Sequence, residues 1–221
     1  MKKFALLFAA AAITASAAFA ATAEPVYSQN AVGFINKEAK AGELYALTFP
    51  FADMTSTNAG VVFKDTQMAQ DATRGSTVYF WSGTSWEPDT KRPNGFRTEH
   101  VLQPGECFFF QPAADMTITM CGEVPDDASL ECEIHPAANL SAIGNPYPVE
   151  VIFTNTALAA SASRGATVYF WNGTSWEPDT RRPNGFRTEH TLSPGEGFFF
   201  QTTAGDTEAS AWAVEKPYVF P

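Results

Sequence analysis

Cysteine is scarce in this sequence of 221 residues, which contains only Cys107, Cys121 and Cys132. No Cys-x-x-Cys pair and no Cys/His spacing typical of zinc sites is present, so a zinc site is not expected. Cys121 and Cys132 flank the turn-like Pro125-Asp126-Asp127, and we expect them to face each other across a hairpin and to form a disulfide in an oxidising compartment. Cys107 would then be the odd thiol.

Positive charge is also scarce, because 14 Lys and Arg stand against 24 Asp and Glu and the formal net charge is −10. Such a chain repels phosphate backbones and anionic headgroups, which argues against nucleic-acid or membrane-surface binding as its main role. Asp89 and Asp179 lack a loop with calcium ligands at alternate positions, so no metal and no other cofactor is expected. The neighbouring Lys91-Arg92 and Arg181-Arg182 are typical of a solvated, charge-balanced loop.

Only one strongly apolar run is present, from Phe4 to about Ile13. It is shorter than the roughly 20 residues of a membrane-spanning helix, and nothing later in the chain replaces it. It follows Met1-Lys2-Lys3 and precedes small residues with possible cleavage sites after Ala20 or Ala23. Residues 1–23 are therefore predicted to be a signal peptide, and the mature chain to be extracellular, on the outer cell surface or in the periplasm, without an integral membrane segment.

An internal repeat dominates the rest of the sequence. Arg74–Gln111 and Arg164–Gln201 align at an offset of 90, and only six of their 38 positions differ. The match continues upstream after a gap of about six residues, which gives units of about 90 residues, long enough for a small core of their own. We predict one module over residues 24–128, with an N-terminal strand, and a second over residues 129–221.

The best-conserved part of the repeat between the two copies predicts a β-hairpin. Thr77–Trp81 is rich in β-formers, and the following Ser82-Gly83 is Asn172-Gly173 in the second copy, a strong signal for a type I′ turn. A two-residue loop would place Trp86 opposite Tyr79 and would gather aromatic rings on one face. Such rings either stack on sugars or on a partner protein, or form the core of a small β domain. The predicted binding residues are Tyr79, Trp81, Trp86, Tyr169, Trp171 and Trp176.

Further strands and a few short helices complete the predicted module. Glu106–Gln111 contains Phe108-Phe109-Phe110, a continuous apolar run suited to a strand buried on both faces, and Met116–Val124 is expected to pair back on it. Helical propensity is confined to Val61–Ala69 and Val151–Ala160. The predicted fold is all-β with minor short helices, in two tandem antiparallel modules that are sandwich- or barrel-like and can pack with pseudo-twofold symmetry.

Carboxylates and histidines recur in both copies. A carboxylate pair on adjacent strands could hydrolyse glycosides, but a duplicated set argues against the single asymmetric cleft that an active site normally needs. His100 and His190 follow glutamates, yet residue alternation places each beside a phenylalanine, which favours a packed or hydrogen-bonded histidine over acid–base or metal chemistry. No catalytic residue is predicted. The recurring carboxylates are Glu87, Asp89, Glu99 and Glu106, with Glu177, Asp179, Glu189 and Glu196.

Three motifs of the second copy resemble those of a known group of modules. Ile143–Pro148 reads IGNPYP, Tyr169–Gly173 reads YFWNG and Pro194–Phe199 reads PGEGFF. This series resembles the repeat modules of bacterial secreted and cell-surface proteins, many of them adhesin-like. The first copy matches less well, since Phe49-Pro50-Phe51 stands where Asn-Pro-Tyr is expected. The resemblance implies surface or extracellular residence and carries over no catalytic residue.

Three functions are compatible with these features. The favoured one is a non-enzymatic secreted or cell-surface protein that acts in adhesion, matrix or envelope structure. The alternative is a pair of carbohydrate-binding modules that use the aromatic clusters, so that the partner is a glycan or another surface protein. A glycoside hydrolase is the third.

Overall fold

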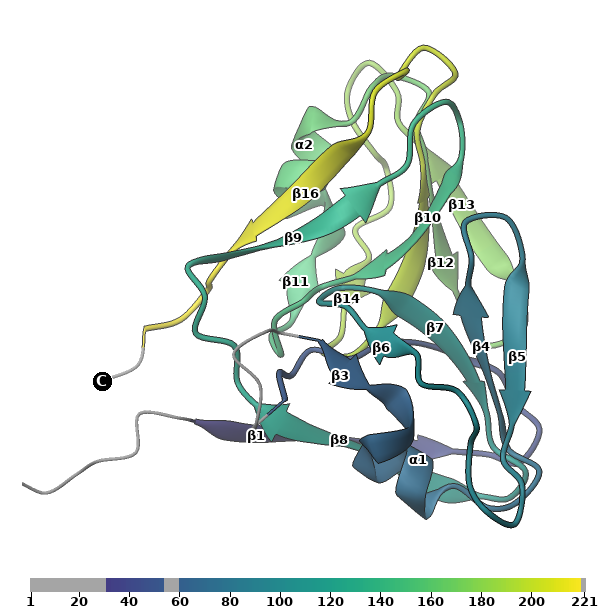
Figure 1. Ribbon diagram of the computed structural model, residues 1–221. Coiled ribbons are helices and arrows are strands. Elements are labelled where there is room, and N and C mark those ends of the chain that lie inside the picture. Colours follow the sequence, from purple (N-terminus) through teal and green to yellow (C-terminus); the bar gives the residue numbers. More distant parts are fainter. Residues whose placement is uncertain (1–30, 54–59, 220–221) are drawn as a thin grey trace, which may run out of the picture.

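The computed structural model describes residues 31–53 and 60–219, so the predicted signal peptide and its cleavage sites lie outside the described residues. The chain forms two similar all-β halves, β1–β8 and β9–β16, each with one short α-helix (Figure 1). Each half contains a four-stranded antiparallel sheet and two-stranded pairs. The predicted fold class and the tandem repeat are therefore confirmed.

The first half contains eight strands and one helix. They are β1 (Val32–Ala39), β2 (Tyr45–Thr48), β3 (Val61–Val62), α1 (Gln67–Asp71), β4 (Thr77–Trp81), β5 (Trp86–Thr90), β6 (Val101–Leu102), β7 (Cys107–Gln111) and β8 (Met116–Glu123). The four-stranded sheet has the order β2-β7-β4-β5, while β1 pairs with β8 and β3 with β6.

The second half repeats this order of elements. They are β9 (Ser129–Ile134), β10 (Leu140–Gly144), β11 (Val151–Ile152), α2 (Ala157–Ser161), β12 (Thr167–Trp171), β13 (Trp176–Thr180), β14 (Thr191–Leu192), β15 (Gly197–Gln201) and β16 (Ser210–Glu215). Its four-stranded sheet has the order β10-β15-β12-β13, while β9 pairs with β16 and β11 with β14.

The helical segments are shorter than the sequence predicts. In the first half, Val61-Val62 is a strand, Phe63–Asp65 is a 3-10 turn and only Gln67–Asp71 is α-helical. Thr66 caps this helix, since its side-chain oxygen accepts a hydrogen bond from the Ala69 N–H at 3.2 Å.

The hairpin forms where it is predicted, but its register differs. Trp81 pairs with Trp86, and Tyr79 pairs with Pro88 instead of Trp86. The predicted two-residue type I′ turn is wrong: Gly83 has a φ of 91°, but Ser82 does not have the positive φ that such a turn requires. A four-residue connection forms instead, in which the Ser82 N–H donates to the Ser85 carbonyl at 2.9 Å. The aromatic rings still lie on one face, because cross-strand partners in a sheet share a face.

The pairing predicted for Met116–Val124 is wrong. Strand β7 is flanked by β2 and β4, and β8 pairs instead with β1 over eight residue pairs. The predicted disulfide is wrong for the same reason: Cys121 lies opposite Phe34 and Cys132 opposite Trp212, in two separate sheets. Cys107, Cys121 and Cys132 are all free thiols.

Each half has a core of its own, built around one fully buried phenylalanine. Phe63 makes edge-on contacts with Phe80, Phe96 and Phe108, with ring centroids 5.1 to 5.8 Å apart. Phe153 does the same in the second half with the matching rings, Phe170, Phe186 and Phe198. Edge-to-face aromatic pairs of this kind add to the stabilisation from buried area. Strand β7 is buried on both faces, as predicted.

The two halves contact each other reciprocally. Leu47 of β2 forms an antiparallel bridge with Glu196 of the second half, and Ile143 of β10 forms the matching bridge with Glu106 of the first half. The Thr48 N–H donates to the Gly195 carbonyl at 3.0 Å, and the Gly144 N–H donates to Gly105 at 2.8 Å. Such exchange of equivalent contacts is what a pseudo-twofold pair requires.

Candidate functional site

The predicted binding aromatics lie between the two halves. Trp81 contacts Phe199 of the other half at a centroid distance of 5.3 Å, and Trp171 contacts Phe109 at 5.4 Å. Trp86 and Trp176 each contact both phenylalanines. Each also contacts the other tryptophan of its own hairpin. We call this set the aromatic seam: Trp81, Trp86, Phe109, Trp171, Trp176 and Phe199.

Hydrogen bonds across the halves fix the orientation of two indoles in the seam. The Trp171 Nε1–H donates to the Leu44 carbonyl at 2.7 Å, and the Trp81 Nε1–H donates to the Leu140 carbonyl at 3.3 Å. The two phenylalanines of the seam are buried, whereas its four tryptophans are half-buried. A buried indole N–H normally needs such an acceptor. Both of these indoles have one, so the aromatic seam is a packed contact between the halves whose tryptophans remain partly exposed.

The two remaining predicted aromatics, Tyr79 and Tyr169, flank the seam. Their hydroxyls donate to the Gln111 and Gln201 side chains at 3.3 and 2.8 Å. Each glutamine in turn donates to a backbone carbonyl of its own half. The structure therefore brings all six predicted residues to one region, four of them within the seam.

The two histidines of the repeat are packed and hydrogen-bonded, as expected. His100 stacks on Phe80 with centroids 4.0 Å apart, and its Nε2 lies 2.6 Å from Glu106 Oε1. The other oxygen of Glu106 accepts from the Gln103 N–H at 3.0 Å. The glutamate thus braces the turn before β7. His190 and Glu196 repeat the 2.6 Å contact in the second half.

Two of the other recurring carboxylates, Asp89 and Asp179, hold the backbone. Asp89 Oδ2 accepts from the N–H groups of Arg97 and Thr98 at 2.7 and 2.8 Å, and Asp179 makes the equivalent pair of bonds at the same distances. Glu99 pairs with Lys64 at 2.6 Å. Within residues 31–53 and 60–219, no group of three or more His, Cys, Asp or Glu side chains is placed to hold a metal ion.

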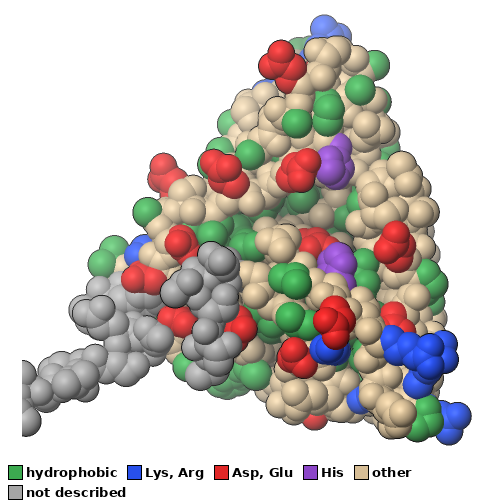
Figure 2. All heavy atoms as spheres, viewed as in Figure 1, with side chains coloured by type: hydrophobic (Ala, Val, Ile, Leu, Met, Phe, Trp, Pro, Cys, Tyr) green, Lys and Arg blue, Asp and Glu red, His purple; other side chains and the backbone are tan. Residues whose placement is uncertain are grey.

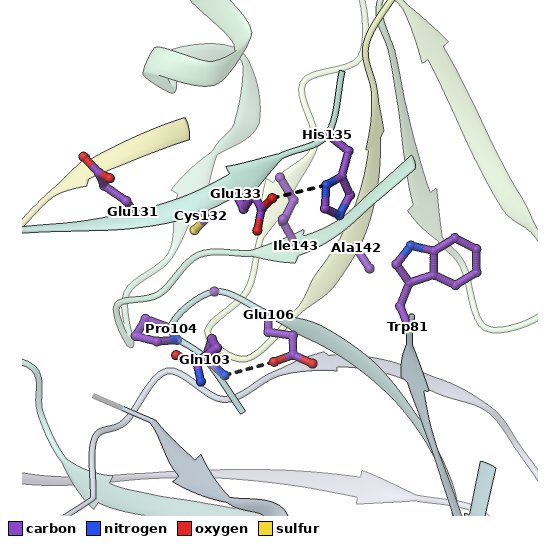
Figure 3. A pocket seen from close by; sticks show the side chains of 11 residues that line it. Trp81, Gln103, Pro104, Glu106, Glu131, Cys132, Glu133, His135, Ala142 and Ile143 are labelled. Carbon is purple, nitrogen blue, oxygen red and sulfur yellow. Dashed lines mark hydrogen bonds and ion pairs between the residues drawn. The ribbon is translucent and has the colours of Figure 1, made fainter. Parts of the chain in front are cut away.

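A pocket of about 370 Å³ opens beside the seam, between the two halves. Trp81 and Glu106 of the first half form part of its wall, opposite Glu133 and His135 from the end of β9 (Figure 3). The His135 Nδ1 lies 3.5 Å from Glu133 Oε1. Figure 2 shows this face hollowed between the halves, with acidic and histidine side chains beside the hollow.

Glu133 and His135 had no functional signal in the sequence. They lie outside the near-identical part of the repeat, and their proximity to Trp81 and Glu106 arises only when the halves pack. The pocket is therefore a composite of both modules. A carboxylate and an aromatic wall in one concave site can orient a polar ligand such as a sugar.

The thiols near the pocket are not poised as nucleophiles. Burial raises the pKa of the Cys132 thiol to about 12 and raises the pKa of Cys107 still further. Because the thiolate is the reactive form, both side chains act as small apolar groups at neutral pH.

Comparisons of the chain with protein-family models, with curated proteins and with solved structures found no match. In the part of the chain that the structure describes, no helix has the length and apolar character needed to cross a membrane.

Proposed function

We propose that this chain is a non-enzymatic exported protein that acts in adhesion, matrix or envelope structure at the cell surface. The observation that carries the proposal is the duplicated structural use of its candidate catalytic groups. Glu106 and Glu196 each contact a histidine with one oxygen and accept from a backbone N–H of the preceding turn with the other, and Asp89 and Asp179 each bind two backbone N–H groups. Groups held in this way in both halves maintain two copies of a scaffold.

The aromatic seam also supports the proposed structural role. A large aromatic contact joins the modules, and cross-half hydrogen bonds from Trp81 and Trp171 hold it in register. Two modules that pack into one unit are suited to bearing load or presenting a fixed surface, whereas independent modules would move relative to each other. The resemblance to adhesin-like repeat modules and the predicted signal peptide agree with this proposal.

Deletion of the gene in the source cells tests the proposal. We expect reduced attachment or matrix formation, and full complementation both by the native chain and by Glu87→Gln/Glu177→Gln, whose exposed carboxylates lie on the outer strands β5 and β13. Protease treatment of intact cells, with cell fractionation, should locate the chain at the surface or in the medium. Loss of complementation by the folded double variant would contradict a non-enzymatic role.

A carbohydrate-binding role is the second candidate, and the pocket between the halves favours it. Trp81 supplies a flat aromatic wall, and Glu106, Glu133 and His135 supply hydrogen-bonding groups. Sugars are commonly bound by such a combination of ring stacking and polar contacts.

A matched pair of variants tests this second candidate. Trp81→Ala and Trp171→Ala remove equivalent rings from the seam, but only Trp81 lines the pocket. On a glycan array, binding by the native chain that Trp81→Ala abolishes and Trp171→Ala retains would support a sugar site in the pocket. Equal binding by all three folded chains, or no binding by the native chain, would count against it.

A further inference from the structure

Strand β16 has an open outer edge. The Lys216 N–H donates to the Ala128 carbonyl beside β9 at 2.9 Å. Because residues of an antiparallel strand alternate between its two edges, Ala211, Ala213 and Glu215 direct their backbone N–H and C=O groups away from β9. Among the described residues, no strand or bridge pairs with that outer edge.

The first half closes the equivalent edge with its own chain. The Val124 N–H donates back to Ala31 at 2.7 Å, so Glu123, the last residue of β8, corresponds to Glu215 of β16. Ala52 forms an antiparallel bridge with Glu123 through two hydrogen bonds of 2.9 and 3.1 Å. The chain here packs so tightly on the strand that a side chain at Gly122 would collide with it.

The second half cannot close its edge in the same way. Pro148 stands where Ala52 stands in the first half, and proline has no N–H to donate. The chain turns away immediately, since the Val149 N–H donates to Tyr147 at 2.8 Å and the Asn145 side chain donates to the Val149 carbonyl at 2.9 Å.

A groove of about 920 Å³ lies along the uncovered edge. The connection beside this edge is short: only three residues connect Tyr147 to Val151, whereas nine connect Phe51 to Val61 at the equivalent place in the first half. Its lining includes Ala213 and its neighbours in β16, together with Val149 and Val151. Glu150 and Glu215 are exposed on its lining, and the Nζ of Lys216, which also lines it, is paired with Asp126 at 2.6 Å, so the rim of the groove is acidic.

We propose that the outer edge of β16 binds an extended peptide segment of another protein by strand addition, with an apolar side chain in the groove. The first half shows the mode, because its segment around Phe51-Ala52 occupies the equivalent edge of β8. Main-chain hydrogen bonds to a free sheet edge, with pockets for alternate side chains, are an established mode of peptide recognition. The acidic rim selects a peptide that carries a basic residue beside its apolar one.

A synthetic peptide tests this site on the intact chain. The probe, Phe-Pro-Phe-Ala-Lys-Met-Thr, has the sequence of residues 49–55 with lysine in place of Asp53. We expect saturable binding at one site per chain by isothermal calorimetry. N-methylation of the probe alanine, which removes the donor equivalent to the Ala52 N–H, should weaken binding about tenfold or more. N-methylation of the adjacent lysine should have little effect, because alternate amides point away from the edge.

Two arginine variants of the chain locate the site. Ala213→Arg places a bulky cation in the groove and should weaken probe binding strongly. Ala211 lies on the same face of the same strand as Ala213 but outside the lining of the groove. The Ala211→Arg variant should therefore bind the probe as the native chain does. Circular dichroism checks that both variants fold.

Three results would overturn the proposal. They are the absence of saturable binding at about millimolar probe, equal weakening by the two N-methyl groups, and equal effects of the two arginine variants. Concentration-dependent self-association that the probe dissociates would assign the edge to a second copy of this chain and overturn the assignment to a different protein. None of these readouts depends on the adhesion or matrix role, so this proposal and the proposed function can fail separately.

Discussion

At the residue scale, the halves differ where their symmetry would bring identical side chains together. Cys107 faces Gly197, its counterpart, and Thr48 faces Gly144, its counterpart. In each pair, a Cβ on the glycine would collide with the side chain opposite. One half therefore supplies the side chain and the other supplies the space, because a packed interior leaves no room for both.

The buried hydroxyl of Thr48 lowers the stability of the folded chain. Its hydroxyl is buried and is without a hydrogen-bond partner in the structure, which is unfavourable for a polar group removed from water. Thr48→Val keeps the shape and removes the unpaired hydroxyl, so it should raise the free energy of unfolding by about 1 kcal/mol. Urea denaturation measures the change. As a control, Thr66→Val should lower stability by about 1 kcal/mol, because Thr66 caps α1.

The three cysteines should differ sharply in reactivity. Cys121 is exposed, whereas burial raises the pKa of Cys132 to about 12 and that of Cys107 further. A thiol reagent at pH 8 should therefore titrate one thiol in the native chain, none in Cys121→Ser, and three in the denatured native chain. A native chain with no reactive thiol would instead indicate a disulfide.

The same raised pKa values give stability a pH dependence. The buried thiols stay protonated in the folded chain, while the unfolded chain ionises them above about pH 8.5. Their contribution to stability is thus fully present below that pH and is lost as the pH rises toward the folded pKa values. Stability that increases between pH 8 and pH 10 would contradict this assignment.

At the scale of the elements, a lysine that directly follows the hairpin strand β5 binds the end of the short helix α1. Lys91 Nζ donates to the carbonyls of Ala69, Gln70 and Ala72 at 2.7 to 2.8 Å. In the second half, Arg181 donates to Ala159 and Ala160 at the end of α2. The last carbonyls of a helix lack partners within it, and a cation there also interacts favourably with the helix dipole.

Replacement of Lys91, a half-buried loop residue, should lower stability. Lys91→Met should lower the free energy of unfolding by about 1–2 kcal/mol. Lys91→Arg should retain most of the stabilisation that Lys91 provides, because Arg181 makes the equivalent contacts in the second half. Chemical denaturation monitored by fluorescence measures both. Lys40→Met removes an exposed ion pair with Asp115 and should change stability far less than Lys91→Met does, so an equal effect of the two methionine variants would refute the capping role.

The sequence predicts local structure well where a turn or a buried run determines it. Gly83 and the buried strand Cys107–Gln111 lie where their residues predict. The role of Lys91 was missed because its acceptors lie about 20 residues away in the chain. The partner of Met116–Glu123 was missed because local alternation does not specify which distant strand completes a pair.

At the scale of the whole molecule, packing of the halves decides what the aromatic side chains do. The sequence leaves open whether Trp81 and Trp171 form a core or a surface, since either use produces the same alternating hairpin. The structure answers with a third arrangement, in which each ring lies between two modules that each have a core of their own. Neither the seam nor the pocket beside it is encoded in one module alone, so a sequence reading of a single module could not find them.

The seam should make the two halves unfold together. Trp86→Ala/Trp176→Ala removes two central rings and leaves both cores intact, so the coupling between the halves should fall while each half stays folded. Calorimetry should show one transition for the native chain and two for the double variant, because weakly coupled domains melt independently. A single transition in both chains would mean that the reciprocal bridges at Leu47 and Ile143 suffice for coupling.

Replacement of single tryptophans by phenylalanine tests the hydrogen bonds across the seam. Trp171→Phe keeps an apolar ring but loses the 2.7 Å bond to Leu44, and Trp81→Phe loses the 3.3 Å bond to Leu140. Trp171→Phe should therefore destabilise the chain more than Trp81→Phe does.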